Sequence, residues 1–418
     1  MMNDVVIVSA CRTAIGAFGG TLKDSHASKL AAVAMKEAIK RAGIEPGIID
    51  DVRFGCCLEP GDSLNVARIG ALLAGIPDSV TAVTINRVCT SAMDAVVSGM
   101  MMIQTGMADI ILAGGTEHMS GIAYTVPSAR WGCRLQDQVF VDTMMQALHV
   151  GSHIIPHPED GPVKSGMPLE LFKGKPYIMG VTAEFVAQHL NISREEMDEV
   201  ALRSHNNAER ATKEGDFREE IVPVEIPQKK GKPPLLFDKD EHFRPGLTMD
   251  QLRQLPPAFV PKIGKVTAGN SSGINDGASA MVIMSADRAK DLGLKPLARI
   301  RGAGKGACHP SVMGLSPVPA MQDLFKRYPD LKMGDFELIE LNEAFAAQYL
   351  GVEKELKLNR EITNVNGSGI GLGHPVGSTG CRIMVTLLYA MKKRGKSLGL
   401  ATICGGGGIG MATALEMI

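Results

Sequence analysis

Runs of apolar residues, and the spacing between them, divide this chain into expected strands and helices. The run Val-Thr-Ala-Val-Thr-Ile at 80–85 predicts a buried strand. Beyond it, small or apolar residues recur every three or four positions from Ala92 to Ile103, which indicates one face of a helix. Cys89 therefore lies in a turn that leads from a strand into a helix.

A second copy of this succession occurs near the end of the chain. A strand-like run at 362–365 precedes a glycine-rich loop, a helical pattern over 378–393 and an apolar strand at 398–404. The first copy ends in the corresponding strand at 110–115, about 290 residues earlier, which exceeds the period of solenoid repeats. We therefore expect two similar α/β halves. Helical patterns between the strands, such as 27–42, favour parallel central strands.

The middle of the chain has a different pattern. From 121 to 247, charged and polar residues become more frequent and strand-like runs shorten, while helical patterns persist over 179–190 and 194–214. The chain is therefore expected to contain three units: an N-terminal half formed by 1–120 and 248–295, an inserted unit at 121–247, and a C-terminal half at 296–418.

Composition narrows the class of protein. The chain has 418 residues, 45% hydrophobic and 21% charged, as in a globular protein with two or three cores. Its net charge of −1 argues against nucleic acid or an acidic membrane as a partner. No apolar run reaches the length of a membrane span, and the strand pattern at Val5 leaves no room for a signal peptide. Eight cysteines without C-x-x-C spacing indicate neither a zinc site nor a redox pair and fit a cytoplasmic location.

Cys89 is the first candidate for chemistry. At a strand-to-helix turn, unpaired backbone N–H groups and the helix dipole favour a thiolate, and such turns present nucleophiles. A lone buried cysteine is otherwise usually a small hydrophobic residue. The turn alone leaves both interpretations open.

Three later segments carry further candidates. Five glycines surround His374 and let the backbone approach a ligand, and an imidazole can accept a thiol proton near neutral pH. Otherwise this segment is a glycine-rich turn with an incidental histidine. Cys404 ends an apolar strand before four glycines, 405–408, whose N–H groups either suit an oxyanion or, as this segment alone favours, only form the turn that closes the strand. Asn342 follows the strand-like run 336–341 and is either a site residue or a helix N-cap.

Together these segments resemble the thiolase family over nearly the whole chain. Besides the Cys89, Asn342, His374 and Cys404 segments, the matching stretches are 6–13, 113–120 and 266–273. The resemblance implies an α/β fold of two similar halves stacked as five layers, αβαβα. It also implies that the inserted unit 121–247 is a loop domain that covers the active site and carries most coenzyme A contacts.

The resemblance also implies roles for these residues in cleaving or forming a 3-oxoacyl thioester. Cys89 becomes acylated, His374 accepts its proton, and Cys404 is the second acid and base. One oxyanion hole uses His374 and a water held by Asn342, and the other uses the N–H groups of Cys89 and Gly406. Coenzyme A is a substrate, and no metal or other cofactor is implied. Substrate or coenzyme A contacts are expected from Ser272, Met179, Ala268 and Phe345.

The default substrate is acetoacetyl-CoA, but two departures from the family pattern suggest an alternative. Residues 149–177 look like an insertion of about 25 residues, and Ile178 stands where the family often has histidine. The alternative is a larger or aromatic 3-oxoacyl-CoA, such as benzoylsuccinyl-CoA, handled with a partner subunit. The insertion is expected to shape the acyl pocket or to dock a partner.

The insertion also contains three histidines at positions 149, 153 and 157, a spacing that suits a metal on one helical face. Pro156 and Pro158 break such a helix, so no metal site is expected. The basic run 229–232 either attracts coenzyme A phosphates or is a solvated loop.

Two other functions compete with a thiolase. A ketoacyl synthase shares the superfold but normally lacks a second cysteine, so Cys404 argues against it. A non-catalytic scaffold or lipid carrier usually loses a catalytic position, whereas all four are present here. The segments 65–68 and 80–85 resemble those that form dimers in the family, which predicts a homodimer or homotetramer.

Overall fold

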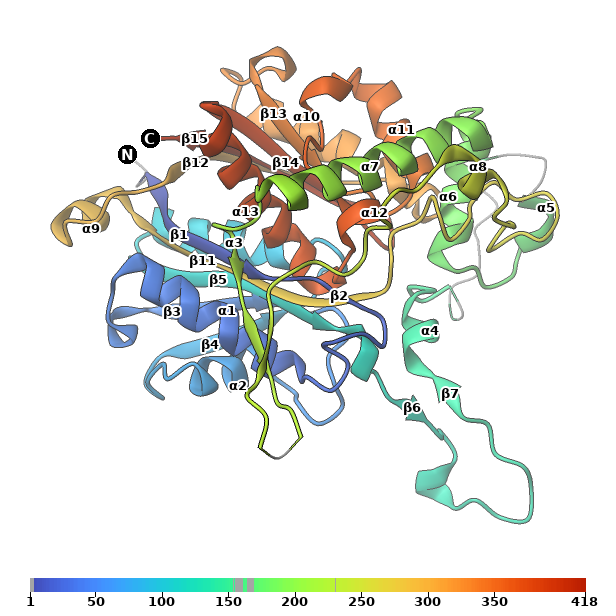
Figure 1. The fold of residues 1–418 in the computed structure, drawn as a ribbon, viewed down its shortest axis with the longest axis horizontal. Coiled ribbons are helices and arrows are strands. Elements are labelled where there is room, and N and C mark those ends of the chain that lie inside the picture. Colours follow the sequence, from blue (N-terminus) through green and yellow to red (C-terminus); the bar gives the residue numbers. More distant parts are fainter. Residues whose placement is uncertain (1–3, 153, 155–160, 164–168, 230) are drawn as a thin grey trace.

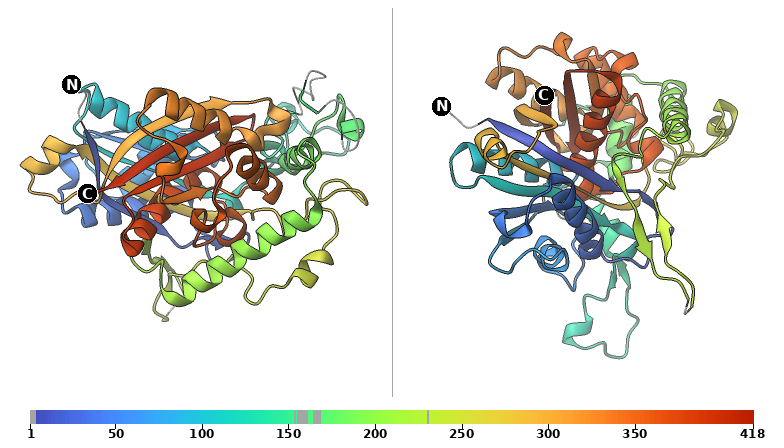
Figure 2. Two further views of the ribbon diagram at one scale, coloured as in Figure 1. Left: turned by 90° about the horizontal axis from the view of Figure 1, so that it is seen from above. Right: turned by 60° about the vertical axis from the view of Figure 1, so that its left-hand side comes forward.

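The computed structural model describes residues 4–152, 154, 161–163, 169–229 and 231–418. Its two β-sheet halves lie on either side of a central pair of helices, with further helices on the outer faces (Figures 1 and 2). This is the five-layered α/β arrangement that the family resemblance implied. Within the described residues, no helix is both long and apolar enough to cross a bilayer.

The N-terminal half contains five principal strands in the order β1-β11-β5-β3-β4. The outer helices α1 and α2 pack together over this half, and α1 also contacts β1, β11 and β5. The bounds are β1 (Val5–Thr13), β3 (Asp51–Gly55), β4 (Thr81–Ile85), β5 (Ile110–His118), β11 (Asn275–Ser285), α1 (Ala27–Ala42) and α2 (Val66–Leu73).

The C-terminal half repeats this arrangement with the order β12-β15-β14-β13, and the two halves join where β1 pairs with β12. Helix α10 covers β12 and β15. The bounds are β12 (Ala298–Ala307), β13 (Leu338–Leu341), β14 (Leu398–Gly405), β15 (Ile409–Met417), α9 (Ala286–Asp291), α10 (Pro317–Arg327), α11 (Ala346–Leu356) and α12 (Gly369–Leu372).

Three details differ from the sequence prediction. The sheets are mixed, because β3–β4, β3–β5 and β13–β14 are parallel whereas the other principal pairs are antiparallel. The run 80–85, expected to be a buried strand, forms the partly exposed edge strand β4. The run 362–365 forms only a one-residue bridge, Thr363 with Ile339, after the 3-10 helix η6 (Arg360–Ile362). A strand at the edge of a sheet need not be fully buried, so an apolar run alone does not show whether a segment is a central strand, an edge strand or only a short bridge.

Helices α3 (Ser91–Gln104) and α13 (Val376–Arg394) form the central layer and contact both halves. Their backbones approach their neighbours closely at glycines. A Cβ atom at Gly115 would lie 2.3 Å from the carbonyl oxygen of Gly377, and one at Gly380 would lie 2.4 Å from the backbone nitrogen of Met93. A larger residue would therefore push α13 away from β5 at Gly115 and away from α3 at Gly380.

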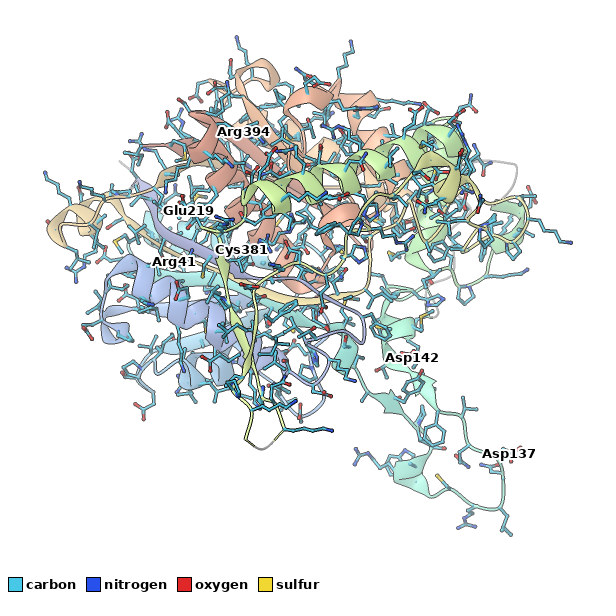
Figure 3. The ribbon with its side chains drawn as sticks, in the orientation of Figure 1. Arg41, Asp137, Asp142, Glu219, Cys381 and Arg394 are labelled. Atoms are coloured by element: carbon cyan, nitrogen blue, oxygen red, sulfur yellow. The ribbon has the colours of Figure 1, made fainter. Side chains whose placement is uncertain are left out.

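The inserted unit contains helices that pack on the C-terminal half and a hairpin that projects from the body. Helix α7 (Arg194–Glu214) starts with a capping box at Ser193 and contacts α11 and α12. Figure 3 shows the hairpin of β6 (Tyr124–Thr125) and β7 (Val141–Asp142), with Asp142 near its base and Asp137 farther out. The remaining α-helices and strands of the whole described chain are α4 (Thr143–Ala147), α5 (Leu169–Phe172), α6 (Met179–His189), α8 (Met249–Arg253), β2 (Gly16–Ala17), β8 (Ile221–Val222), β9 (Val224–Ile226) and β10 (Leu235–Phe237).

A buried ion cluster ties the segment after α7 to the N-terminal half. The Arg12 guanidinium on β1 donates to both carboxylate oxygens of Asp240, at 2.7 and 2.9 Å, and to Glu220 at 2.6 Å. All three side chains are almost completely buried. Since an unpaired buried charge is costly, these partners hold Glu220 and Asp240 against β1. The division into units at 120, 247 and 295 stays a prediction.

Candidate active site

Cys89 follows a tight turn between β4 and α3, as the sequence predicted. Val88 has a left-handed φ of +51°, which is unusual for a β-branched residue. Neighbouring side chains hold this conformation: Asn86 Oδ1 accepts the Val88 N–H at 3.0 Å, and the Ser91 hydroxyl donates to the Val88 carbonyl at 2.5 Å. The strained turn thus fixes the direction of the Cys89 side chain.

The Cys89 thiol is not a resting thiolate, contrary to the sequence expectation. Burial raises its pKa to about 11, although the backbone N–H groups of Gly406 and of Cys89 itself lower it. The charge of Glu117 raises it slightly. The apolar cluster around Cys89, which includes Met144 and Val376, explains why desolvation outweighs the N–H groups. The thiol is therefore neutral before substrate arrives.

Cys404 and Gly406 reach Cys89 from the C-terminal half. Cys404 is fully buried at the end of β14, and burial raises the pKa of its thiol well above the ordinary value, followed by the charges of Cys89 and Cys308. Beyond Cys404 the chain turns through Gly407 and Gly408, which both have positive φ angles. This turn places the Gly406 N–H opposite the Cys89 sulfur.

Asn342 continues β13 and is not a helix cap. Its backbone N–H donates to the Thr402 carbonyl on β14 at 3.0 Å, and the N-cap of α11 is Phe345. The side-chain nitrogen Nδ2 lies 3.5 Å from Nε2 of His374, and its buried Oδ1 has no hydrogen-bond partner within the described chain. The amide therefore presents unused hydrogen-bonding capacity beside His374.

His374 lies just before α13, almost completely buried. Its backbone N–H donates to Oδ1 of Asn275 at 2.9 Å, and its Nδ1 lies 2.8 Å from the hydroxyl oxygen of Thr379. Burial, followed by the positive charge of Arg382, lowers the pKa of His374 to about 3. The imidazole is thus neutral in the resting protein, with Nε2 facing Asn342.

The residues expected to contact coenzyme A lie in different settings. The Met179 sulfur would lie 3.3 Å from a Cβ atom at Gly406, so it packs over the hairpin turn. The Ser272 N–H donates at 3.0 Å to the carbonyl just before Phe345, which joins these two segments. Ala268 is exposed. The structure thus places Met179 beside the Gly406 turn and Ser272 beside the segment that follows Asn342.

Sequence reasoning missed the residues that hold the candidate side chains in place. These are Asn275 and Thr379 around His374, and Glu117, whose carboxylate accepts N–H groups from Cys57, Leu58 and Gly377. Glu117 and Asn275 belong to or follow family-like stretches, but a single sequence does not reveal which backbone groups they bind.

The histidines of the insertion provide no described metal site. His149 Nδ1 lies 2.7 Å from the carbonyl of Met145, and His153 and His157 fall outside the described residues. No group of three histidine, cysteine or acidic side chains suited to a metal occurs within the described ranges. Ile178 is the N-cap of α6 and packs against the core of the C-terminal half.

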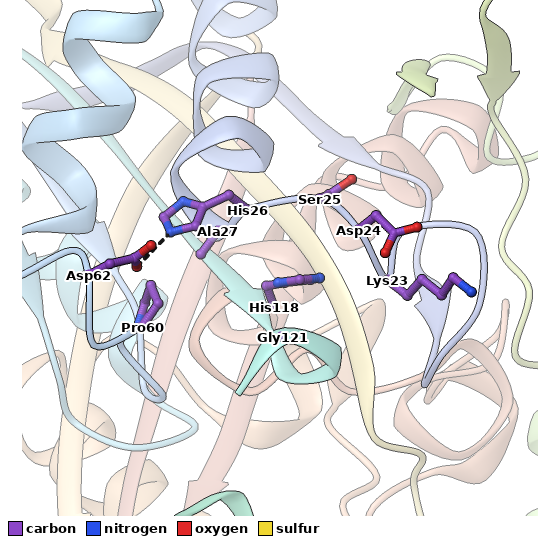
Figure 4. Close-up of a pocket in the computed structure, with 9 residues that line it drawn as sticks. All are labelled: Lys23, Asp24, Ser25, His26, Ala27, Pro60, Asp62, His118 and Gly121. Carbon is purple, nitrogen blue, oxygen red and sulfur yellow. Dashed lines mark hydrogen bonds and ion pairs between the residues drawn. The ribbon is translucent and has the colours of Figure 1, made fainter. Parts of the chain in front are cut away.

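A separate pocket of about 220 Å³ contains none of the predicted site residues (Figure 4). Its His26 caps α1 by accepting the Ser28 N–H at 3.1 Å, and the other ring nitrogen lies 3.1 Å from Asp62. His118 contacts the Leu22 carbonyl at 3.1 Å. These contacts account for both histidines as structural groups.

Comparisons with known proteins agree with this geometry. The thiolase N-terminal domain family matches residues 5–154 and 164–287, and the thiolase C-terminal domain family matches 294–417. The chain is 47% identical to the acetyl-CoA acetyltransferase of Syntrophomonas wolfei over 100% of both chains. It is 46% identical to that of Cupriavidus necator over 99% of this chain and 100% of the relative.

Solved structures agree as well. The Bacillus anthracis acetyl-CoA acetyltransferase superposes with a TM-score of 0.91 at 45% identity, covering 100% of this chain and 99% of the other. Human mitochondrial 3-ketoacyl-CoA thiolase in complex with CoA superposes with a TM-score of 0.89 at 38% identity, covering 100% and 98%. These matches extend over both halves and the inserted unit. The chain belongs to the thiolase family of acyltransferases.

Proposed function

We propose that this thiolase cleaves acetoacetyl-CoA with coenzyme A, or forms it from two acetyl-CoA molecules, through an acyl group on Cys89. The observation that carries this assignment is the meeting of the two halves at one sulfur. The Gly406 N–H from the C-terminal half is directed at the Cys89 thiol, and a charge on Cys89 would raise the pKa of the buried Cys404 thiol. A nucleophile, an oxyanion donor and a second thiol are what the reaction needs.

In the first step the Cys89 sulfur attacks the keto carbon, and the thiol proton passes to Nε2 of His374. The bond between the keto carbon and the adjacent carbon then breaks, leaving an acyl-Cys89 and the enolate of acetyl-CoA. Cys404 donates a proton to the enolate carbon. The N–H groups of Cys89 and Gly406 stabilise the oxygen of the tetrahedral intermediate, while protonated His374 and a water on Asn342 stabilise the enolate oxygen.

In the second step the thiol of coenzyme A loses its proton to Cys404 and attacks the acyl-Cys89. The shortened acyl-CoA leaves, and the Cys89 sulfur recovers a proton from His374. His374 thereby returns in the second step the proton that it accepted in the first, and Cys404 recovers a proton in place of the one that it donated. Coenzyme A acts as a substrate, and this scheme uses no further cofactor and no metal.

The resting site is neutral, which affects the timing of proton transfer. Burial raises the Cys89 pKa to about 11 and lowers the His374 pKa to about 3, so a thiolate–imidazolium pair is unfavourable without substrate. Negative charge on the substrate oxygen would offset the imidazolium in the first step. We therefore propose that His374 takes the proton as the carbon–sulfur bond forms.

The surroundings of Cys89 support a short acyl group. The apolar side chains that share its cluster include Met119, Met144 and Leu148. Val150, at the start of the predicted insertion, covers the oxyanion-hole turn, since its Cγ2 would lie 2.6 Å from a Cβ atom at Gly406. We propose that this start of the insertion forms one wall of the acyl pocket. The relatives' names do not favour the aromatic alternative with its partner subunit.

We propose a homo-oligomeric assembly in the cytoplasm. The strand β4 lies at the edge of its sheet, and the projecting hairpin exposes large apolar side chains, including Trp131 and Phe140. All eight cysteines are free thiols, which fits a reducing compartment. Light scattering at micromolar concentration should give at least a dimer, and a fully active monomer would refute the assembly.

Replacing the nucleophile tests the acyl-enzyme. Cys89→Ser should abolish turnover while preserving the fold, because a hydroxyl is a much poorer nucleophile than a thiol at neutral pH. Mass spectrometry after mixing wild-type protein with acetoacetyl-CoA should find acetyl on Cys89. Cys133→Ser, at an exposed position of the projecting hairpin, is the matched control and should remain active. Labelling of Cys404 in an active Cys89→Ser variant would contradict the assignment.

Removing the amide tests the first oxyanion hole. Asn342→Ala should lower kcat by about 10²- to 10³-fold, since that is the typical effect of losing one such donor. Coenzyme A binding, measured by calorimetry, should change little. Asn359→Ala, which removes an exposed asparagine, is the control. If Asn342→Ala raises KM and leaves kcat unchanged, the amide binds ground-state substrate instead.

The pH dependence of alkylation tests the neutral resting thiol. A thiol with a pKa of about 11 should react with iodoacetamide about tenfold faster for each unit of pH from 7 to 9, because the thiolate fraction grows by that factor. The rate is followed on the Cys89 peptide by mass spectrometry. A plateau between pH 6 and 8 would show that the free enzyme already holds a thiolate.

A further inference from the structure

Thr379 is a buried side chain that contacts Nδ1 of the His374 imidazole. It lies in the first turn of α13, fully buried. Its Oγ1 is 2.8 Å from Nδ1 of His374 and 2.8 Å from the carbonyl oxygen of Pro375. One hydroxyl thus faces two possible hydrogen-bond partners at the same short distance.

Counting hydrogens assigns the ring tautomer. A threonine hydroxyl carries one hydrogen, and a carbonyl oxygen can only accept. If the hydroxyl donates to Pro375, its contact with His374 is a hydrogen bond only when Nδ1 carries the ring hydrogen. With the hydrogen on Nε2 instead, one of the two 2.8 Å contacts would set two lone pairs against each other.

The other side of the ring agrees with this assignment. Nε2 of His374 faces a donor, the side-chain nitrogen of Asn342, at 3.5 Å. A ring nitrogen without hydrogen can accept from that amide. A protonated Nε2 would meet a second N–H group there.

We infer that Thr379 is a positioning residue that holds neutral His374 in the Nδ1–H tautomer and so leaves the Nε2 lone pair free to take the Cys89 proton. This inference rests on the proposed function, because it assigns Nε2 to the thiol. After the transfer, Nε2–H becomes the donor to the enolate oxygen, while Nδ1–H continues to donate a hydrogen bond to the Thr379 hydroxyl oxygen. Thr379 itself touches neither substrate nor Cys89 in this scheme.

The electrostatic surroundings keep the imidazole neutral, so that its tautomer matters. Arg382 lies one turn beyond Thr379 on the same helix and is almost completely buried. Its closest charged partner is Glu340, at 3.9 Å, and its guanidinium nitrogens have no hydrogen-bond partner within the described chain. Burial, followed by this positive charge, lowers the pKa of His374 to about 3.

Nitrogen-15 NMR of histidine-labelled full-length protein tests the tautomer directly. His374→Asn provides the difference spectrum that identifies the His374 signals. Wild-type protein at pH 7 should show a protonated Nδ1 and an unprotonated Nε2. A wild-type spectrum with hydrogen on Nε2 would overturn the inference, since Thr379 would then donate to Nδ1.

Two substitutions at position 379 test the consequence for catalysis. Thr379→Val keeps the shape and removes the hydroxyl, and should lower kcat by about 10- to 100-fold, as is typical when the partner that orients a functional histidine is lost. The rate of Cys89 acylation in a single turnover should fall by the same factor, with KM for coenzyme A unchanged. Thr379→Ser restores the hydroxyl and should recover kcat to within about threefold of wild type.

Thr413→Val is the matched control, because Thr413 is a fully buried threonine whose hydroxyl has no partner within the described chain. It should leave kcat unchanged. The inference fails if Thr379→Val acylates Cys89 at the wild-type rate, or if Thr379→Ser is as slow as Thr379→Val. If Thr379→Val does not fold, the wild-type spectrum and the serine variant still decide.

Failure of the tautomer assignment is distinguishable from failure of the proposed function. An active thiolase whose Nε2 carries the hydrogen at rest refutes only the role of Thr379. A protein without thiolysis activity, or one that is not acylated at Cys89, refutes the proposed function whatever the NMR spectrum shows.

Discussion

The candidate site depends on one buried carboxylate at the amino end of α13. Glu117, at the end of β5, accepts the Gly377 N–H at 2.7 Å, the Cys57 N–H at 3.0 Å and the Leu58 N–H at 3.1 Å. It therefore joins a strand and a loop of the N-terminal half to a helix of the C-terminal half. Since the buried Gly377 N–H and the partly buried N–H groups of Cys57 and Leu58 would otherwise lose these bonds, this junction is strongly specified.

The same junction brings His374 and Cys89 into one region. Gly377 lies three residues after His374, and its carbonyl oxygen approaches β3 and β5 at positions where only glycine leaves room. Cys89 lies just before α3, which packs directly against α13 in the central layer. Small displacements of α13 would therefore change the position of His374, the proposed base, relative to Cys89, the proposed nucleophile. Burial at this junction also raises the pKa of Glu117 to about 7, despite the N–H groups that lower it.

The site combines neutral titratable groups with fixed polar donors. The thiols of Cys89 and Cys404 and the imidazole of His374 are all kept uncharged by burial. The Gly406 N–H and the Asn342 amide, in contrast, are held in place by the β14–β15 turn and by the β13–β14 pairing. Such an arrangement stabilises charge when it develops on a substrate, rather than storing it on the protein beforehand.

The sequence by itself predicted most of the helices and strands and the repeat of two α/β halves, although the run 362–365 forms only a one-residue bridge. Helices over 27–42 and 194–214 occur as the periodicity predicted, because an amphipathic helix is a local property. The turn before α3 and the glycine hairpin after Cys404 were likewise readable from short segments. The family resemblance then gave the catalytic set its order and its proposed roles.

Only the tertiary structure decided how these residues behave. The sequence favoured a thiolate at Cys89 because it showed the helix terminus, but the pKa depends on how much water the folded protein removes, and burial outweighs the N–H groups. Likewise, the direction of strands and the edge position of β4 are set by long-range pairing. The contacts of Glu117, Asn275 and Thr379 join segments or orient a ring in ways that no local pattern encodes. Local propensity therefore determined which helices and turns form, whereas desolvation and long-range hydrogen bonds determined the protonation and orientation of the side chains in the site.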